Sequence, residues 1–353
     1  MSCFEDLSGE ILMAIFEYMN VEDVWTIFFN MNARFHSLVF DSRLRLTADV
    51  SKVDKLNYDQ FCSSLINKNF SNIYKLILSN HYNRYPQIRS FLSQTAFTIF
   101  QSLHALTLID INHDELIEIT QQIKQLPYLN YLHINTQSIE YSKELTSATY
   151  ALLNQSNIRV SIFHLHERLQ WPETETISSC NTEVLSLDYI NADRLVFLLP
   201  HCSYLRSLSV TLDPRTSLSK LTQGDISSSL TFPQITCLRL CYRPFDLSTL
   251  ENLLNSVPSV RRFSMETLVY STDYIRSPFW TLLLQQYLPS LERIHLVVRG
   301  WFVLKTSNNT NDEKLDEASI TDSYRYDHYW LDRAYKHIFK CLVDSSTAVL
   351  EIR

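Results

Sequence analysis

The chain has 353 residues, of which 45% are hydrophobic and 20% are charged, and its formal net charge is −7. This composition is typical of a globular protein and excludes a disordered or fibrous chain. The acidic balance argues against a nucleic-acid partner, because neutralising phosphates requires clustered Lys and Arg. No apolar run reaches the roughly 18 residues that span a bilayer, so we expect no membrane partner either.

Glycine and cysteine usage narrows the class further. Only Gly9, Gly224 and Gly300 occur, and neither phosphate-binding glycine motif is present, which excludes nucleotide enzymes built on those loops. Seven cysteines form no C-x-x-C pair, as expected of reduced thiols. The N-terminus also lacks the basic region of a signal peptide. These features predict a cytoplasmic and/or nuclear protein with no cofactor.

The first forty residues predict three short helices. Apolar residues at helical spacing mark the first helix, Asn20 is expected to cap the second, and Asn32 the third. Six acidic residues against Arg34 alone give residues 1–40 a balance of −5. Three helices cannot bury so much apolar surface alone, so part of it meets either the next domain or another protein. On spacing alone, an N-terminal cap on the following domain and a docking module both remain open.

The stretch DLSGEILMAIFEYMNVEDVWTIFFNMNARFHSLV resembles the F-box. Twelve of its residues fall on the family pattern: Leu7, Glu10, Ile11, Leu12, Ile15, Phe16, Tyr18, Met19, Asp23, Val24, Phe35 and Leu38. Ser8 stands where the family usually has proline at a first helical position, so we expect modestly weaker helix initiation.

The F-box docks on a Skp-type adaptor within a cullin-RING ubiquitin ligase, so the resemblance implies that partner for this chain. Part of the first two helices should also pack on the downstream domain. The predicted adaptor-binding residues are Leu7, Ile11, Leu12, Ile15, Phe16, Tyr18, Met19, Val24, Trp25 and Phe28.

Beyond residue 41, a pattern of hydrophobic, two residues, hydrophobic, one residue, hydrophobic recurs. Its segments begin at residues 41, 73, 103, 129, 160, 182, 205, 235, 260 and 291. Helical stretches lie between them, such as 113–126, 143–155 and 248–257, the last with Ser248 and Glu251 at capping-box spacing. A strand and a helix in each unit, at this period, resemble leucine-rich repeats in an irregular form.

The predicted fold class is therefore α/β: an N-terminal three-helix F-box (1–40) followed by a curved leucine-rich-repeat-like solenoid of strand-helix units (41–353). The alternative is an α/β domain with a parallel sheet whose strands alternate with helices. Residues 305–322 are polar and charge-mixed and predict a mobile insertion. Residues 324–343 predict an amphipathic helix, and 347–352 a last strand, which together cap the array.

Residues between the hydrophobic positions of each strand are expected on the concave, solvent-exposed side. This side includes Tyr131, His133, His164 and His166. Three imidazoles on neighbouring strands are zinc-ligand types, but no cysteine or carboxylate at sensible spacing completes a shell. We predict no metal, and interpret these residues as polar contacts for a protein ligand.

The same side carries a second candidate group. Arg262 and Arg293 occupy equivalent positions on consecutive strands, and Arg239 lies diagonally beside them on the preceding strand. Together with His295 they are further substrate-binding candidates, suited to a phosphorylated or acidic segment. The alternative is a solvated basic face, balanced by Glu266, Glu292 and the acidic run at 312–317.

No nucleophile-elbow or catalytic-cysteine signature is present, so we predict no catalytic residues. The predicted function is substrate recognition in an SCF-type ubiquitin ligase: the N-terminal motif binds the adaptor and the repeats bind a protein substrate. Two alternatives remain open. One is a binding scaffold of the same fold that never joins a ligase, and the other is a hydrolase using the concave histidines.

Overall fold

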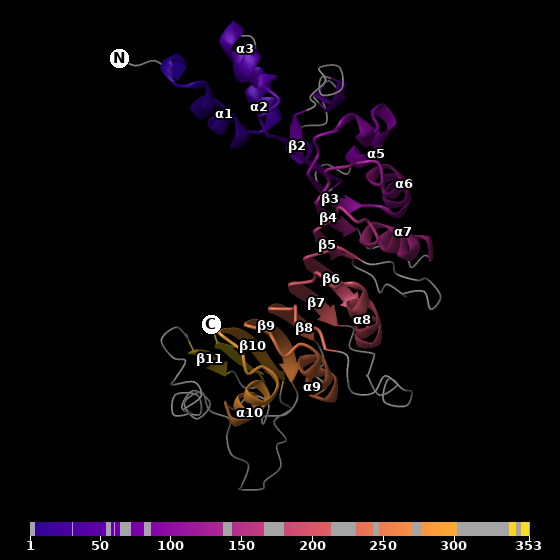
Figure 1. The fold of residues 1–353 in the computed structure, drawn as a ribbon, viewed down its shortest axis with the longest axis vertical. Helices are drawn as coiled ribbons and strands as arrows, with labels where there is room; N and C mark the ends of the chain where they lie inside the picture. Colours follow the sequence, from indigo (N-terminus) through magenta and orange to yellow (C-terminus); the bar gives the residue numbers. More distant parts are fainter. Residues whose placement is uncertain are drawn as a thin grey trace. The chain divides into compact units, whose positions relative to one another are not determined.

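The chain folds into two compact units, Met1–Thr182 and Glu183–Arg353, and each contains parallel strands and helices (Figure 1). The structure is a computed structural model. It describes residues 4–29, 31–53, 58–59, 61–63, 72–80, 86–136, 143–165, 180–212, 231–242, 247–269, 277–301, 339–343 and 347–352.

Unit 1 begins with helices and continues as a parallel sheet. Its helices are α1 (Gly9–Glu17), α2 (Val21–Phe28), α3 (Ala33–Val39), α5 (Gln87–Gln94), α6 (His113–Ile123) and α7 (Lys143–Leu153), with short 3-10 helices η1 (Phe4–Asp6), η2 (Val50–Lys52) and η3 (Phe97–Ile99). Its strands are β1 (Leu46–Asp49), β2 (Ile73–Ser79), β3 (Ala105–Ile111), β4 (Tyr131–Thr136) and β5 (Val160–His164). Each strand pairs in parallel with the next one along the chain.

Unit 2 repeats this arrangement and ends in antiparallel strands. Its parallel strands are β6 (Val184–Ile190), β7 (Ser207–Leu212), β8 (Cys237–Tyr242), β9 (Arg262–Val269) and β10 (Arg293–Trp301). Its helices are α8 (Ala192–Leu198), η4 (Leu199–His201), α9 (Leu247–Ser256) and α10 (Ser277–Tyr287). Strand β12 (Thr347–Ile352) pairs antiparallel with β10, and β11 (Phe339–Val343) pairs antiparallel with β12.

The predicted architecture of a three-helix F-box followed by a curved leucine-rich-repeat-like solenoid was wrong. The described residues form an α/β fold with ten parallel strands and nine α-helices, which is the alternative interpretation. The reason is that hydrophobic segments every 22–32 residues mark any parallel strand followed by a crossover helix. A strand overlaps each of the ten expected segments, so the period predicts where the strands lie. It does not distinguish between the two architectures.

Side chains alternate strictly between buried and accessible positions in four of the strands. In β4, β5, β7 and β9 every second residue is buried and the residues between them are partly exposed. Figure 1 shows α5, α6 and α7 along one side of β2–β5 in unit 1, and α8 and α9 along one side of the strands in unit 2. We call the other side of each sheet, which carries the partly exposed residues, its open face. Parallel sheets are usually covered on both faces, so a polar open face is a surface available to a ligand.

Several expected helix boundaries are corrected by the structure. Ser8 is the N-cap of α1 rather than its first residue, and its Oγ accepts from the Ile11 N–H at 3.4 Å, so the missing proline costs little. Helix α9 starts at Leu247, one residue before the expected cap Ser248. A capping box instead joins Asn112 to Glu115 at the start of α6.

The expected helix over 324–343 is also wrong at its C-terminal end, because Phe339–Val343 form strand β11. Pairing with β12 satisfies the backbone groups of this segment within a sheet, which a helical pattern in the sequence does not reveal. The expected strand at 347–352 is confirmed as β12. The insertion at 305–322 lies outside the described residues. In the part of the chain that is described, no helix combines the length and apolarity needed to cross a bilayer.

Candidate functional site

The three N-terminal helices enclose an aromatic core. Phe16 is fully buried, with its ring centroid 4.7 Å from that of Phe28 and 6.3 Å from that of Phe35. Leu12 and Val24 are fully buried as well. Four of the ten predicted adaptor-binding residues, Leu12, Phe16, Val24 and Phe28, are therefore core residues in this structure.

The remaining predicted residues are accessible to different degrees. Tyr18 is 94% exposed and Ile11 is 50% exposed, and Ile15 between them is half-buried. Their spacing of i, i+4 and i+7 places all three on one side of α1, and we call them the α1 stripe. Leu7, Met19 and Trp25 are half-buried. The Trp25 ring stacks on Phe29 at 3.5 Å between centroids.

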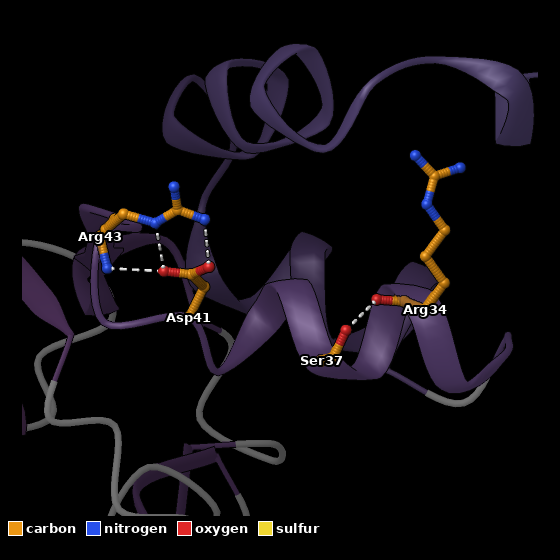
Figure 2. Close-up of polar contacts among 4 residues, drawn as sticks. All are labelled: Arg34, Ser37, Asp41 and Arg43. Atoms are coloured by element: carbon orange, nitrogen blue, oxygen red, sulfur yellow. Dashed lines mark hydrogen bonds and ion pairs between the residues drawn. The ribbon is translucent and has the colours of Figure 1, made fainter.

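Polar contacts lie within and just after the third helix (Figure 2): the Ser37 Oγ donates to the Arg34 carbonyl at 2.8 Å, and Asp41 pairs with Arg43. The guanidinium of Arg34 donates to the backbone carbonyls of Glu5 and Leu7, which joins the N-terminal segment to α3. After α3, the Arg43 guanidinium donates to the Asp41 carboxylate at 2.8 and 3.0 Å. These hydrogen bonds, and one from the Arg43 backbone N–H, lower the pKa of Asp41 to about 2.

The N-terminal helices also bond directly to the sheet of unit 1. Asn20 stands at the N-cap position of α2 as expected, but its side chain makes no cap hydrogen bond. Instead its Oδ1 accepts from the Asp49 N–H at 2.9 Å and its Nδ2 donates to the Asp49 carbonyl at 3.3 Å. The Asn72 Nδ2 donates to the Val39 carbonyl at 2.9 Å. The expected packing of the first two helices on the following domain is confirmed for α2 by the Asn20 contacts, and a boundary at residue 40 stays a prediction.

The open face of unit 1 brings two of the predicted histidines together. Tyr131 and His133 lie on β4, and His164 ends β5 opposite Asn135. The His133 and His164 rings are 5.2 Å apart between centroids, edge to face. His133 Nε2 and Asn135 Oδ1 are buried and have no hydrogen-bond partner among the described residues. His166 lies outside the described residues.

The environment of His133 predicts a pH dependence. Burial, followed by the nearby His164 and Lys75, lowers the pKa of His133 from its ordinary value of 6.5. The unfolded chain therefore binds a proton at higher pH than the folded one, so stability is lost as pH falls through about 6.5. We expect His133→Asn to flatten the loss of stability between about pH 7 and 5 in urea titrations. An unchanged slope would contradict this environment for His133.

Sequence reasoning missed one aromatic group in unit 1. The Tyr74 ring stacks on His104 at 4.4 Å between centroids, His104 stacks on Tyr128 at 5.7 Å, and the Arg45 guanidinium lies 5.3 Å from the Tyr74 centroid. Arg45, Tyr74 and His104 lie between the hydrophobic positions of the strand pattern, and Tyr128 directly precedes one of its segments. The pattern does not specify which residue types occupy these positions, so it did not single out this group.

The predicted arginines gather on the open face of unit 2. Arg262 and Arg293 are register partners on β9 and β10, as expected. Arg239 on β8 pairs with Ser264, two residues beyond Arg262, which confirms its diagonal position. His295 is register partner to Ser264, and its Nδ1 lies 3.3 Å from the Ser264 Oγ. The histidines of unit 1 and the arginines of unit 2 are thus two separate groups.

Neither comparison with known proteins nor a search for metal-binding groups assigns a function to this chain. No protein-family model and no curated protein matches this chain. Among the described residues, no three His, Cys, Asp or Glu side chains lie close enough together to hold a metal ion. The resemblance of residues 6–39 to the F-box and the predicted function therefore remain predictions.

Proposed function

We propose that the chain is a non-catalytic recognition subunit of an SCF-type ubiquitin ligase, binding a Skp-type adaptor through its N-terminal helices and a protein substrate through an open sheet face. The observation that carries the proposal is the α1 stripe. Three apolar side chains stand on one side of an acidic helix, although a complete aromatic core lies behind them. Exposed apolar groups arranged in this way are typical of a protein-protein contact.

Further exposed apolar residues support the same surface. Ile27 and Met31, at and beyond the end of α2, are each 50% exposed. An apolar helix face surrounded by negative charge favours a partner with an apolar groove and a basic rim. The polar open faces are the surfaces that we assign to the second contact, with the substrate.

Replacing Ile11 and Tyr18 together by Asp tests the adaptor contact. Two charges in an apolar interface are expected to weaken binding of a purified Skp-type adaptor by about a hundredfold or more. Phe16 is unsuitable for this test because it is buried in the core. The measurement is adaptor titration of the full chain by calorimetry, with circular dichroism to check folding.

The matched control replaces Ile99 and Leu282, also exposed apolar residues, by Asp. We expect this control to bind the adaptor as the wild type does. If the Ile11 and Tyr18 variant is folded and still binds normally, the α1 stripe is not the contact. If the wild-type chain does not bind the adaptor, the scaffold alternative replaces ligase membership.

A further inference from the structure

Three arginines on the open face of unit 2 form a compact basic row. Arg262 and Arg293 are register partners on neighbouring strands, which are about 4.8 Å apart in a sheet. Arg239 is diagonal to Arg262, at a distance of roughly 7–8 Å between backbones. All three side chains are exposed. We call Arg239, Arg262 and Arg293 the basic row.

The acidic residues expected to balance the basic row pair with other arginines. Glu292 bonds to Arg261 at 3.4 Å, and Glu266 bonds to Arg299 at 3.4 Å. In the described part of the chain, none of the three basic-row guanidiniums makes a hydrogen bond or an ion pair. The acidic run at 312–317 lies outside the described residues. Three like charges thus lie close together on one face, two of them directly opposite each other, in a protein whose net charge is −7.

The register neighbours of the basic row are small or polar residues. Ser207 and Cys237 continue the register of Arg262 across β7 and β8, and Ser209 continues that of Arg239. These side chains are short, whereas the arginines beside them are long and cationic. The Ser264 hydroxyl and the His295 imidazole add polar groups within the same rows.

We propose that the basic row binds a phosphorylated serine or threonine on an extended segment of the protein substrate, a proposal that rests on the proposed recognition function. One carboxylate is satisfied by one bidentate guanidinium. A phosphate monoester carries about two negative charges and three acceptor oxygens, so it matches several guanidiniums at once. Substrate recognition is then switched on by a kinase.

The test uses the purified full-length chain without adaptor. The probe is a fluorescent degenerate peptide library with one fixed phosphoserine, compared by anisotropy with the same library carrying serine. We expect the phosphorylated library to bind more tightly, with affinity falling as salt is raised. Changing Arg239, Arg262 and Arg293 together to Gln should lower that affinity by about tenfold or more.

A matched control removes the same charge elsewhere. Arg89→Gln, Lys124→Gln and Arg159→Gln alter exposed cations of unit 1, and this variant should bind the phosphorylated library as the wild type does. Equal binding of the two libraries, or full binding by the basic-row variant, would overturn the proposal. So would pyrophosphate binding as tightly as the peptide, because the site would then be one for a small anion. Adaptor binding is measured in a separate titration, so failure of the phosphopeptide proposal and failure of the adaptor proposal can be told apart.

Discussion

Replacing Phe16 by Ala is expected to destabilise the packing of the three N-terminal helices against one another. The ring is fully buried between Phe28 and Phe35, and a buried Phe→Ala change costs about 3–5 kcal/mol of the free energy of unfolding. Amide hydrogen exchange over α1–α3, together with urea unfolding of the full chain, measures the effect.

Ile11→Ala is the control for this substitution. It lies on the same helix at a half-exposed position, so its cost should stay within about 0.5–1 kcal/mol. Equal costs for the two substitutions would mean that α1 presents a different side to the core. The comparison also separates loss of fold from loss of adaptor contact, since Ile11 belongs to the α1 stripe and Phe16 does not.

Asn80→Ala is expected to be nearly as damaging in unit 1. The buried amide donates to the Glu115 carboxylate at 2.9 Å and to the Asp110 carbonyl at 3.1 Å, and it accepts from the Ile88 N–H at 3.0 Å. Its removal leaves the buried Glu115 with one donor fewer, and three hydrogen bonds are lost at once. We expect a loss of about 2–4 kcal/mol in urea unfolding.

Two variants calibrate this result. Asn181→Ala removes one exposed hydrogen bond, from Nδ2 to the Ser156 carbonyl at 2.9 Å, and should cost about 1 kcal/mol or less. The Asn80 amide and the Asn112 N–H both donate to Oε2 of Glu115. Glu115→Gln keeps one side-chain oxygen for these two donors, so its effect on the free energy of unfolding should be small. A cost for Asn80→Ala no larger than that for Asn181→Ala would argue against the buried network.

Local pattern alone predicted much of the fold. The strands, the three N-terminal helices and the alternation of buried and accessible residues follow from periods of 2 and 3.6 residues, which are properties of neighbouring positions. The same regularity placed Arg262 beside Arg293, because equivalent positions of successive parallel strands become register partners. The cap at Asn32 was also predictable, since its side chain accepts from the Phe35 N–H three residues away.

Tertiary structure decided the features that depend on residues about thirty positions apart. The strand-helix period did not separate a solenoid from a parallel α/β sheet, and the apolar pattern of α1 did not show that Phe16 faces the core while Ile11 faces outward. The architecture and the orientation of α1 both depend on which elements pack against each face of the sheet or helix. Asn80 meets Glu115, and Glu292 pairs with Arg261 rather than with the basic row, only because the register brings these residues together. Hydrogen bonds and ion pairs act over a few ångströms in space, so a sequence fixes their donors and acceptors while the packed sheet selects the partners.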